Sequence, residues 1–173
     1  GRGRKLSPSP VAEVALAAGV PLLRPEKVGA EDCVKALRSH RPDVGVVVAF
    51  GQFLPKPVRE LPRLGYVINA HASLLPKHRG AAPIARAILA GDSRTGISVM
   101  RVERDMDAGP VASVHELEIG DEENAGELSN RLAQLLRRLG LGVGDRIALM
   151  LENHPRYFEI CWAAQRAGII YTA

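Results

Sequence analysis

Short runs of apolar residues alternate along this chain with segments in which apolar positions recur at helical spacing. Residues 44–50 and 66–68 are continuously apolar and rich in β-branched side chains, a pattern typical of strands covered on both faces of a sheet. Residues 96–102 alternate between apolar and polar positions, which predicts another strand, and residues 110–119 predict its antiparallel or mixed neighbour. Residues 20–23 are a further short strand candidate.

The helical segments carry start and stop signals of their own. Pro83 falls in the first turn of one predicted helix and Gly91 ends it, as helix-terminus preferences require. The same reasoning predicts helices over residues 11–18, 31–38, 55–61, 81–90 and 125–139. After a glycine-rich loop, a compact β-α-β unit is predicted from a strand at 146–151, a helix at 155–167 and a strand at 169–172.

The alternation of strands and helices predicts an α/β fold with a mainly parallel, Rossmann-like sheet. The character of the chain changes near residue 126, so we expect a core at residues 1–126 and a tail at residues 127–173. One hypothesis is that the tail completes the sheet, with residues 147–150 paired to residues 46–48. The alternative is a partial sheet with a separately packed tail.

Composition limits the classes of function. The 173 residues carry a net charge of +4, and only 4% are aromatic, which argues against a stacking platform for single-stranded nucleic acid. No apolar run reaches the roughly 20 residues that span a bilayer, so no membrane partner is expected. Two cysteines form no CxxC, and the chain opens without an apolar signal core, which indicates a cytoplasmic protein. Arg2, Arg4 and Lys5 cluster at this end and could bind phosphates, but on charge alone a frayed terminus is the favoured explanation.

Three polar side chains at predicted strand ends form a candidate catalytic site. Asn69 and His71 are two residues apart, so on an extended backbone they project from the same side. Asp107 lies in a polar turn that follows the next strand, and its carboxylate can face the imidazole if the strands are neighbours. An amide and an imidazolium suit the oxyanion of acyl transfer to an amine, while the carboxylate holds the imidazole and helps to move the proton. On spacing alone, a surface histidine beside an N-capping asparagine remains the alternative.

Two motifs carry a family resemblance. Residues 69–76 spell Asn-Ala-His-Ala-Ser-Leu-Leu-Pro, and residues 79–84 spell Arg-Gly-Ala-Ala-Pro-Ile. With these motifs, residues 1 to about 130 resemble the folate-dependent formyltransferases, and within that group the catalytic domain of the methionyl-tRNA formyltransferases. The segments that precede Gly1 in that family, including its central strand, are not in this sequence, so we expect residues 44–50 to have an unpaired edge.

The resemblance implies transfer of a formyl group from 10-formyltetrahydrofolate to the amine of methionyl-tRNA, in the initiation of translation and without a metal. It implies a catalytic trio of Asn69, His71 and Asp107. It leaves the oligomeric state open. The folate pocket that it implies comprises Phe50, Gly51, Gln52, Phe53, Leu54, Ser73, Leu74, Leu75, Pro76, Arg104, Asp105 and Met106. The basic loop that would contact the tRNA comprises Arg2, Arg4 and Lys5.

The tail resembles a different family. From about residue 127 to residue 173 the sequence is similar to the start of an acyl-CoA synthetase of the adenylate-forming class. The ATP-phosphate loop of that class would lie beyond Ala173, so we expect no ligase activity. Two alternatives to the enzyme therefore stand: an inactive structural fragment or chimera of two families that retains at most folate binding, and a fragment of an adenylate-forming acyl-CoA ligase.

Overall fold

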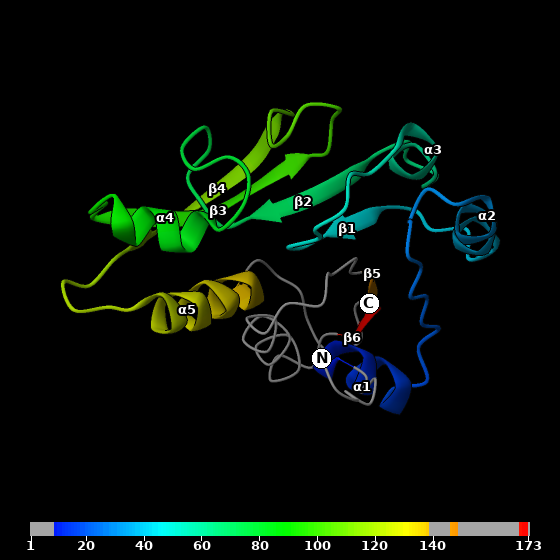
Figure 1. The fold of residues 1–173 in the computed structure, drawn as a ribbon, viewed down its shortest axis with the longest axis horizontal. Helices are drawn as coiled ribbons and strands as arrows, with labels where there is room; N and C mark the ends of the chain where they lie inside the picture. The colour runs from blue at the N-terminus through cyan, green and yellow to red at the C-terminus, as the bar shows by residue number, and fades with distance from the viewer. Residues whose placement is uncertain (1–8, 139–145, 149–169, 173) are drawn as a thin grey trace, which may run out of the picture.

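A four-stranded mixed sheet forms the centre of the fold (Figure 1). The computed structural model describes residues 9–138, 146–148 and 170–172. The strands β1 (Gly45–Val47), β2 (Val67–His71), β3 (Arg94–Arg101) and β4 (Val111–Glu118) lie in chain order across the sheet. The pairing of β1 with β2 is parallel, whereas β2 with β3 and β3 with β4 are antiparallel. The predicted α/β class is confirmed, but among the described strands of this sheet only one pairing is parallel.

The helices lie close to their predicted bounds. Ser9 caps the first helix by accepting the N–H of Ala12 at 3.2 Å, and Asn124 caps the last through its side-chain oxygen. Glu127 accepts the N–H of Asn124 in return, which completes a capping box. The bounds are α1 Pro10–Ala17, α2 Glu31–Ser39, α3 Lys56–Arg59, α4 Pro83–Leu89 and α5 Ala125–Arg138.

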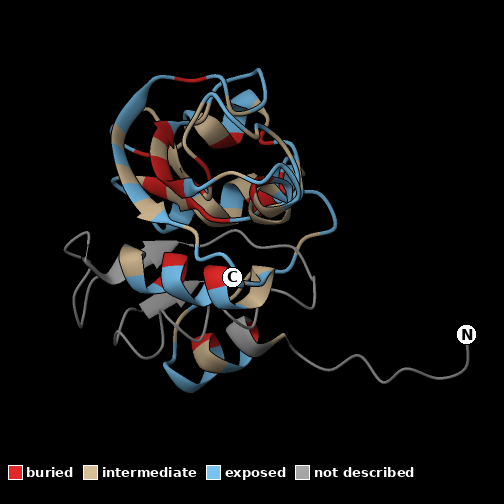
Figure 2. Ribbon diagram, turned by 90° about the vertical axis from the view of Figure 1, so that its left-hand side faces the viewer, coloured by how far each residue is buried: buried red, intermediate tan, exposed pale blue. Residues whose placement is uncertain are grey.

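Two apolar clusters hold helices α2 to α5 on the sheet. One joins β1 and β2 to α2 and α3 around the buried side chains of Val47, Val58 and Val67. The other joins β3 to α4 and α5 around Ile97 and Leu128. Figure 2 shows the buried residues concentrated inside this body of sheet and helices. The polar residues Asn69 and His71 lie at the carboxyl end of β2.

Two strand predictions need correction. Residues 20–23 form no strand, since Pro21 has no N–H to donate to a ladder. The predicted strand at 44–50 ends at Val47 because Ala49 adopts a left-handed backbone conformation with φ of 49°, which interrupts an extended ladder. The residues after β1 therefore form a turn that leads toward α3.

The tail contributes a second, separate strand pair. Strands β5 (Arg146–Ala148) and β6 (Ile170–Thr172) are parallel to each other, with β5 beside β1 and β6 beside α1 (Figure 1). Within the described residues, β5 is hydrogen-bonded to β6 and not to β1, so the hypothesis of a completed sheet is wrong for this strand. The helix predicted at 155–167 lies outside the described residues. The division of the chain near residue 126 stays a prediction.

Candidate active site

Strand β2 presents Asn69 and His71 on one face of the sheet, as their spacing predicts. Cross-strand pairing with β3 places His71 opposite Ser98 and Asn69 opposite Met100. Directly opposed residues of an antiparallel pair share a face, so these four side chains lie on the same side of the sheet. Ala70 between them belongs to the opposite apolar cluster with α4 and α5. Packing on the far face thus fixes which way the two polar side chains point.

Asp107 joins this pair from the turn between β3 and β4. Its Oδ1 accepts from Nδ2 of Asn69 at 3.4 Å, and its Oδ2 lies 3.4 Å from Nδ1 of His71. The backbone N–H of Gly80 donates to the same Oδ2 at 2.8 Å. A left-handed backbone, with φ of 48°, turns Asp107 back toward the strand ends. The structure therefore brings together all three residues of the predicted trio, whose catalytic role stays a prediction.

His71 is buried and faces an acceptor at each ring nitrogen. Its Nδ1 faces Asp107, and its Nε2 lies 3.0 Å from the backbone oxygen of His78. Both ring nitrogens therefore lie within reach of an oxygen that can accept a hydrogen bond. Nδ1 shares the Asp107 carboxylate with the Asn69 amide, so it is the ring nitrogen that can act on a substrate together with that amide. The buried Oδ1 of Asn69 has no hydrogen-bond partner, which leaves an acceptor for a substrate N–H.

The loop that follows β2 is anchored by two serines. Ser98 donates to the backbone oxygen of Ser73 at 2.7 Å and accepts the N–H of Leu75 at 3.0 Å. Ser73 in turn donates to the backbone oxygen of Lys77 at 2.6 Å. Both serines are fully buried. Their hydroxyls replace the water that a turning backbone would otherwise need, and so fix the loop over the sheet.

The predicted folate residues divide by exposure. Leu54 lies in the core, Phe50 packs against it, and Gln52 uses its side-chain oxygen to accept the N–H of Val28 at 2.9 Å. Ser73 is buried in the loop described above. Leu74 and Leu75 are half-buried. The exposed members of the predicted pocket are Gly51, Phe53, Pro76, Arg104, Asp105 and Met106. Phe53 and Met106 are exposed at 66% and 73%, which is high for large apolar side chains.

The remaining features to be located are the basic residues near the start of the chain, a metal site and a membrane-spanning helix. Arg2, Arg4 and Lys5 lie outside the described residues. Among the residues described, no cluster of three histidine, cysteine, aspartate or glutamate side chains is arranged to hold a metal ion. Within that part of the chain, no helix is long and apolar enough to cross a membrane.

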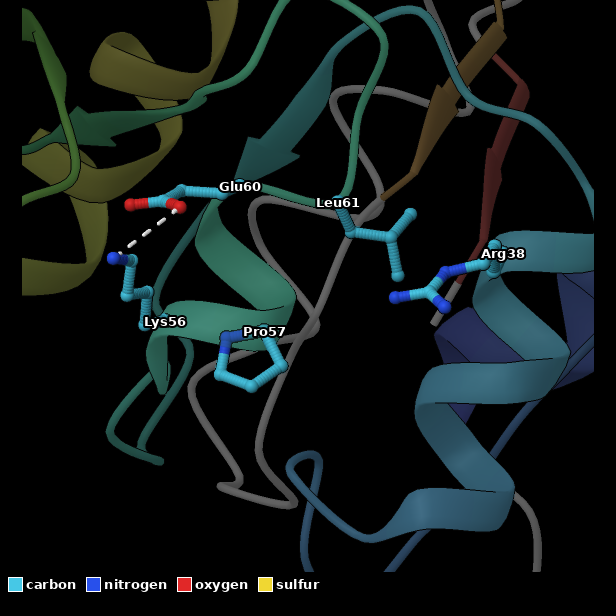
Figure 3. A pocket seen from close by; sticks show the side chains of 5 residues that line it. All are labelled: Arg38, Lys56, Pro57, Glu60 and Leu61. Carbon is cyan, nitrogen blue, oxygen red and sulfur yellow. Dashed lines mark ion pairs between the residues drawn. The ribbon is translucent and has the colours of Figure 1, made fainter.

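An open pocket of about 390 Å³ lies elsewhere, between α2 and α3 (Figure 3). An ion pair of 3.9 Å joins Lys56 to Glu60 at its edge, and both of these side chains are mostly exposed. Its described lining contains none of the trio and none of the predicted folate residues: Arg38, Lys56, Pro57, Glu60 and Leu61. The predicted site at the strand ends is therefore distinct from this pocket.

Three contributors to the site were missed by sequence reasoning. Ser98 could have been found, since it is a polar position in the apolar alternation of its strand. The N–H of Gly80 and the carbonyl of His78 are backbone groups, and any residue type supplies them. Residue identity therefore gives no direct signal for these two contacts.

Comparisons with known proteins find relatives of this chain in sequence and in structure. A family model described as formyl transferase matches residues 1–139, and a model of AMP-binding enzymes matches residues 123–173. A methionyl-tRNA formyltransferase from Methylobacterium nodulans is 50% identical over 149 residues, which cover 84% of this chain and 48% of the relative. One from Thermus thermophilus is 44% identical over 163 residues, covering 94% and 53%. The chain thus spans about half the length of the curated relatives it matches.

Solved structures show the same fold. Phosphoribosylglycinamide formyltransferase from Bacillus halodurans superposes with a TM-score of 0.66 at 22% identity, over 75% of this chain and 70% of the other. Glycinamide ribonucleotide transformylase 1 from Geobacillus kaustophilus gives a TM-score of 0.64 at 27% identity, over 74% and 71%.

Proposed function

The chain belongs to the formyl transferase family, and from this premise we propose that it transfers a formyl group from 10-formyltetrahydrofolate to the amino group of methionyl-tRNA, in the initiation of translation. The observation that carries the proposal is the convergence of Asn69, His71 and Asp107 at the carboxyl end of β2. The names of the relatives support the choice of acceptor.

The side chains have complementary tasks in this reaction. The donor supplies a formyl carbon that is open to attack by an amine. Nδ2 of Asn69 and Nδ1 of His71 lie beside one carboxylate, so both can donate to a carbonyl oxygen that is bound next to them and gains negative charge. Asp107 keeps the imidazole in place and accepts the proton that the attacking amine must lose. As the tetrahedral adduct collapses, the bond between the formyl carbon and N10 of the donor breaks, and N10 takes up that proton as tetrahydrofolate leaves. No nucleophilic side chain is required, because the amine of the substrate attacks directly.

The residues around the trio fit a folate. The unpartnered Oδ1 of Asn69 fits a donor N–H, and the exposed side chains of Phe53 and Met106 offer apolar surface on the two predicted pocket loops. Backbone groups of residues 50–54 and 104–107 would hold the polar edges of the ligand. We expect Arg2, Arg4 and Lys5 to approach the acceptor end of the tRNA, and we expect the protein to act in the cytoplasm.

The tail has no catalytic task in this proposal. We infer that residues 127–173 serve as a scaffold of the kind that opens adenylate-forming enzymes, in line with the match at residues 123–173. The helix α5 also packs against β3 and α4, which ties the start of the tail to the formyltransferase core. A fragment with no turnover and an acyl-CoA ligase fragment remain the alternatives to be tested.

The decisive experiment uses the 173-residue chain with 10-formyltetrahydrofolate and methionyl-tRNA. We expect formylmethionyl-tRNA to form, and we expect the product to disappear in His71→Ala. A rise in melting temperature with reduced folate but no product would favour the inactive fragment. Exchange of pyrophosphate into ATP in the presence of a fatty acid would favour the ligase.

A further inference from the structure

We propose that His78 and Asp92 are a positioning pair that sets the orientation of the His71 ring. For its effect on turnover, this inference rests on the formyl transfer proposed above. Neither residue belongs to the predicted trio or to the predicted folate pocket. The pair acts through the loop between β2 and α4, whose backbone contacts the imidazole.

His78 is joined to the site by its backbone and to α4 by its side chain. Its carbonyl oxygen lies 3.0 Å from Nε2 of His71, while its own Nε2 lies 2.6 Å from Oδ2 of Asp92. Its backbone is left-handed, with φ of 53°, a conformation that disfavours residues with a Cβ. Such a conformation persists only where surrounding contacts impose it. The contact with Asp92 is one that can do so.

Asp92 is itself held in place. Its N–H donates to the backbone oxygen of Ala87 at 3.0 Å, which ties it to the end of α4. Its second carboxylate oxygen lies 3.2 Å from Nζ of Lys77. Hydrogen bonds from His78 and then from Lys77 hold the pKa of the Asp92 carboxyl below its usual value. The acceptor that faces His78 is therefore an ionised carboxylate on a fixed element.

Burial distinguishes this contact from an ordinary surface ion pair. The side chains of His78 and Asp92 are 14% and 17% exposed, whereas that of Lys77 is 64% exposed. Surface pairs contribute little because water screens them, and a shielded, charge-assisted hydrogen bond fixes geometry more firmly. We therefore assign the positioning to His78 with Asp92, and not to Lys77.

The consequence for catalysis follows from the second ring nitrogen of His71. With Nε2 held by the carbonyl of His78, Nδ1 faces Asp107 at 3.4 Å. At 3.4 Å this contact is at the long end for a hydrogen bond, so it tolerates little rotation of the ring away from Asp107. If the His78 carbonyl moved, the His71 ring would lose its alignment with Asn69 and Asp107. All the groups that touch the substrate would still be present.

Two substitutions at one position separate the pair from the backbone. In His78→Gln the side-chain nitrogen can reach Asp92 much as Nε2 does, so we expect turnover within about three-fold of the original. In His78→Asn the amide is too short, although asparagine tolerates the left-handed backbone well. We expect His78→Asn to lower kcat by roughly ten-fold or more, as small misplacements of reacting groups do, with little change in the KM for the folate. Asp92→Ala should match His78→Asn.

A spectroscopic measurement tests the positioning directly. Long-range ¹H–¹⁵N NMR of the full chain reports the ring nitrogens of His71, assigned by their loss in His71→Gln. We expect the Nε2 signal to shift in His78→Asn and in Asp92→Ala, and to stay in place in His78→Gln. Asp43→Asn is the matched control, because Asp43 pairs with Arg63 at an exposed site outside the described active-site contacts.

The outcomes separate the two proposals. If the full chain forms no formylmethionyl-tRNA, the proposed function fails, and the NMR signals of His71 still decide the positioning pair. Wild-type His71 signals and wild-type kcat in folded His78→Asn or Asp92→Ala would overturn the inference. Should one of these variants fail to fold, the other decides.

Discussion

Oδ2 of Asp107 lies 3.4 Å from Nδ1 of His71, and both side chains are largely shielded from water. The backbone N–H of Gly80 donates to the same oxygen. One carboxylate oxygen therefore contacts both the loop after β2 and the imidazole. A single acidic residue in the β3–β4 turn thus organises groups from two other segments.

Removal of the imidazole should abolish most of the activity. We expect His71→Ala to lower kcat for formylmethionyl-tRNA by about 10²- to 10⁴-fold, because general acid–base and oxyanion roles contribute on this scale. Folate binding should persist, since Ser98 anchors the loop that carries residues 73–76 independently of the ring. Steady-state kinetics and folate-dependent melting check both statements. His40→Ala is the control, because His40 is exposed and none of the described hydrogen bonds or ion pairs joins it to the trio. Equal losses in the two variants would argue against a catalytic role of His71.

Replacement of the amide by an acid tests the electrostatics of the trio. In Asn69→Asp two carboxylates would meet across the distance of 3.4 Å that now separates the amide from Asp107. We expect the unfolding free energy at pH 7 to fall by on the order of 1–3 kcal/mol, because like charges in a shielded site repel. The loss should shrink on acidification, since protonation of either acid removes the repulsion. Urea denaturation at pH 7 and pH 4 measures this, with Asn69→Ala as the uncharged control. A loss independent of pH would contradict the explanation.

The polar positions on β2 could be predicted, because a two-residue period fixes the side from which Asn69 and His71 project. Asp107 could be singled out as a polar turn residue, but its approach to His71 depends on the left-handed backbone that turns it back. The contacts of Gly80 and His78 use backbone groups, so their residue types gave no direct signal. The same limit applies to the function: spacing indicates acyl transfer, and only the family motifs indicate folate and tRNA.

The fold could be predicted to the level of its elements. Periodicity located α2, α4 and α5 closely, because amphipathic faces and end signals are local. The length of β1 was overestimated, since nothing in a continuous apolar run indicates the left-handed backbone at Ala49 that ends the strand. The parallel pairing of β5 with β6 agrees with the predicted β-α-β unit. Whether β5 also pairs with β1 could not be decided, because the choice between neighbouring strands depends on contacts distant in the sequence and not on the strand itself.

Ser98 should be important for stability as well as for the site. In Ser98→Ala the backbone oxygen of Ser73 and the N–H of Leu75 lose their partner. We expect the unfolding free energy to fall by roughly 2 kcal/mol, within the range for unsatisfied buried polar groups. Ser39→Ala is a matched control, since its hydroxyl donates to a backbone oxygen at an exposed helix end. Chemical denaturation of both variants makes the comparison, and equal stabilities would show that the loop is held by other contacts.

Gly96 allows the loop after β2 to approach β3. A Cβ at this position would lie 2.1 Å from the backbone oxygen of His115 and 2.8 Å from Cδ2 of Leu74. We expect Gly96→Ala to lower the unfolding free energy by roughly 2 kcal/mol or more, because a backbone atom cannot move aside as a side-chain end can. Gly120→Ala should change it by less than about 1 kcal/mol, since a Cβ there meets only ordinary contacts. Thermal denaturation measures both losses in stability. A small loss in Gly96→Ala would show that β3 and β4 can move apart at this position to make room for the Cβ.

Asp92 should make stability depend on acid. Hydrogen bonds from His78 and Lys77 lower the pKa of its carboxyl in the folded protein, so the stabilisation is complete above the ordinary pKa of about 3.9 and is lost as the pH falls through the lower, folded value. Asp92→Asn should therefore be less stable than the original chain at pH 7, and the gap should close as the pH approaches 2. Urea denaturation across this range measures the gap. Asp43→Asn, which removes an exposed pair with Arg63, should show a small gap throughout. A gap at residue 92 that widens on acidification would reverse the sign of the proposed contact.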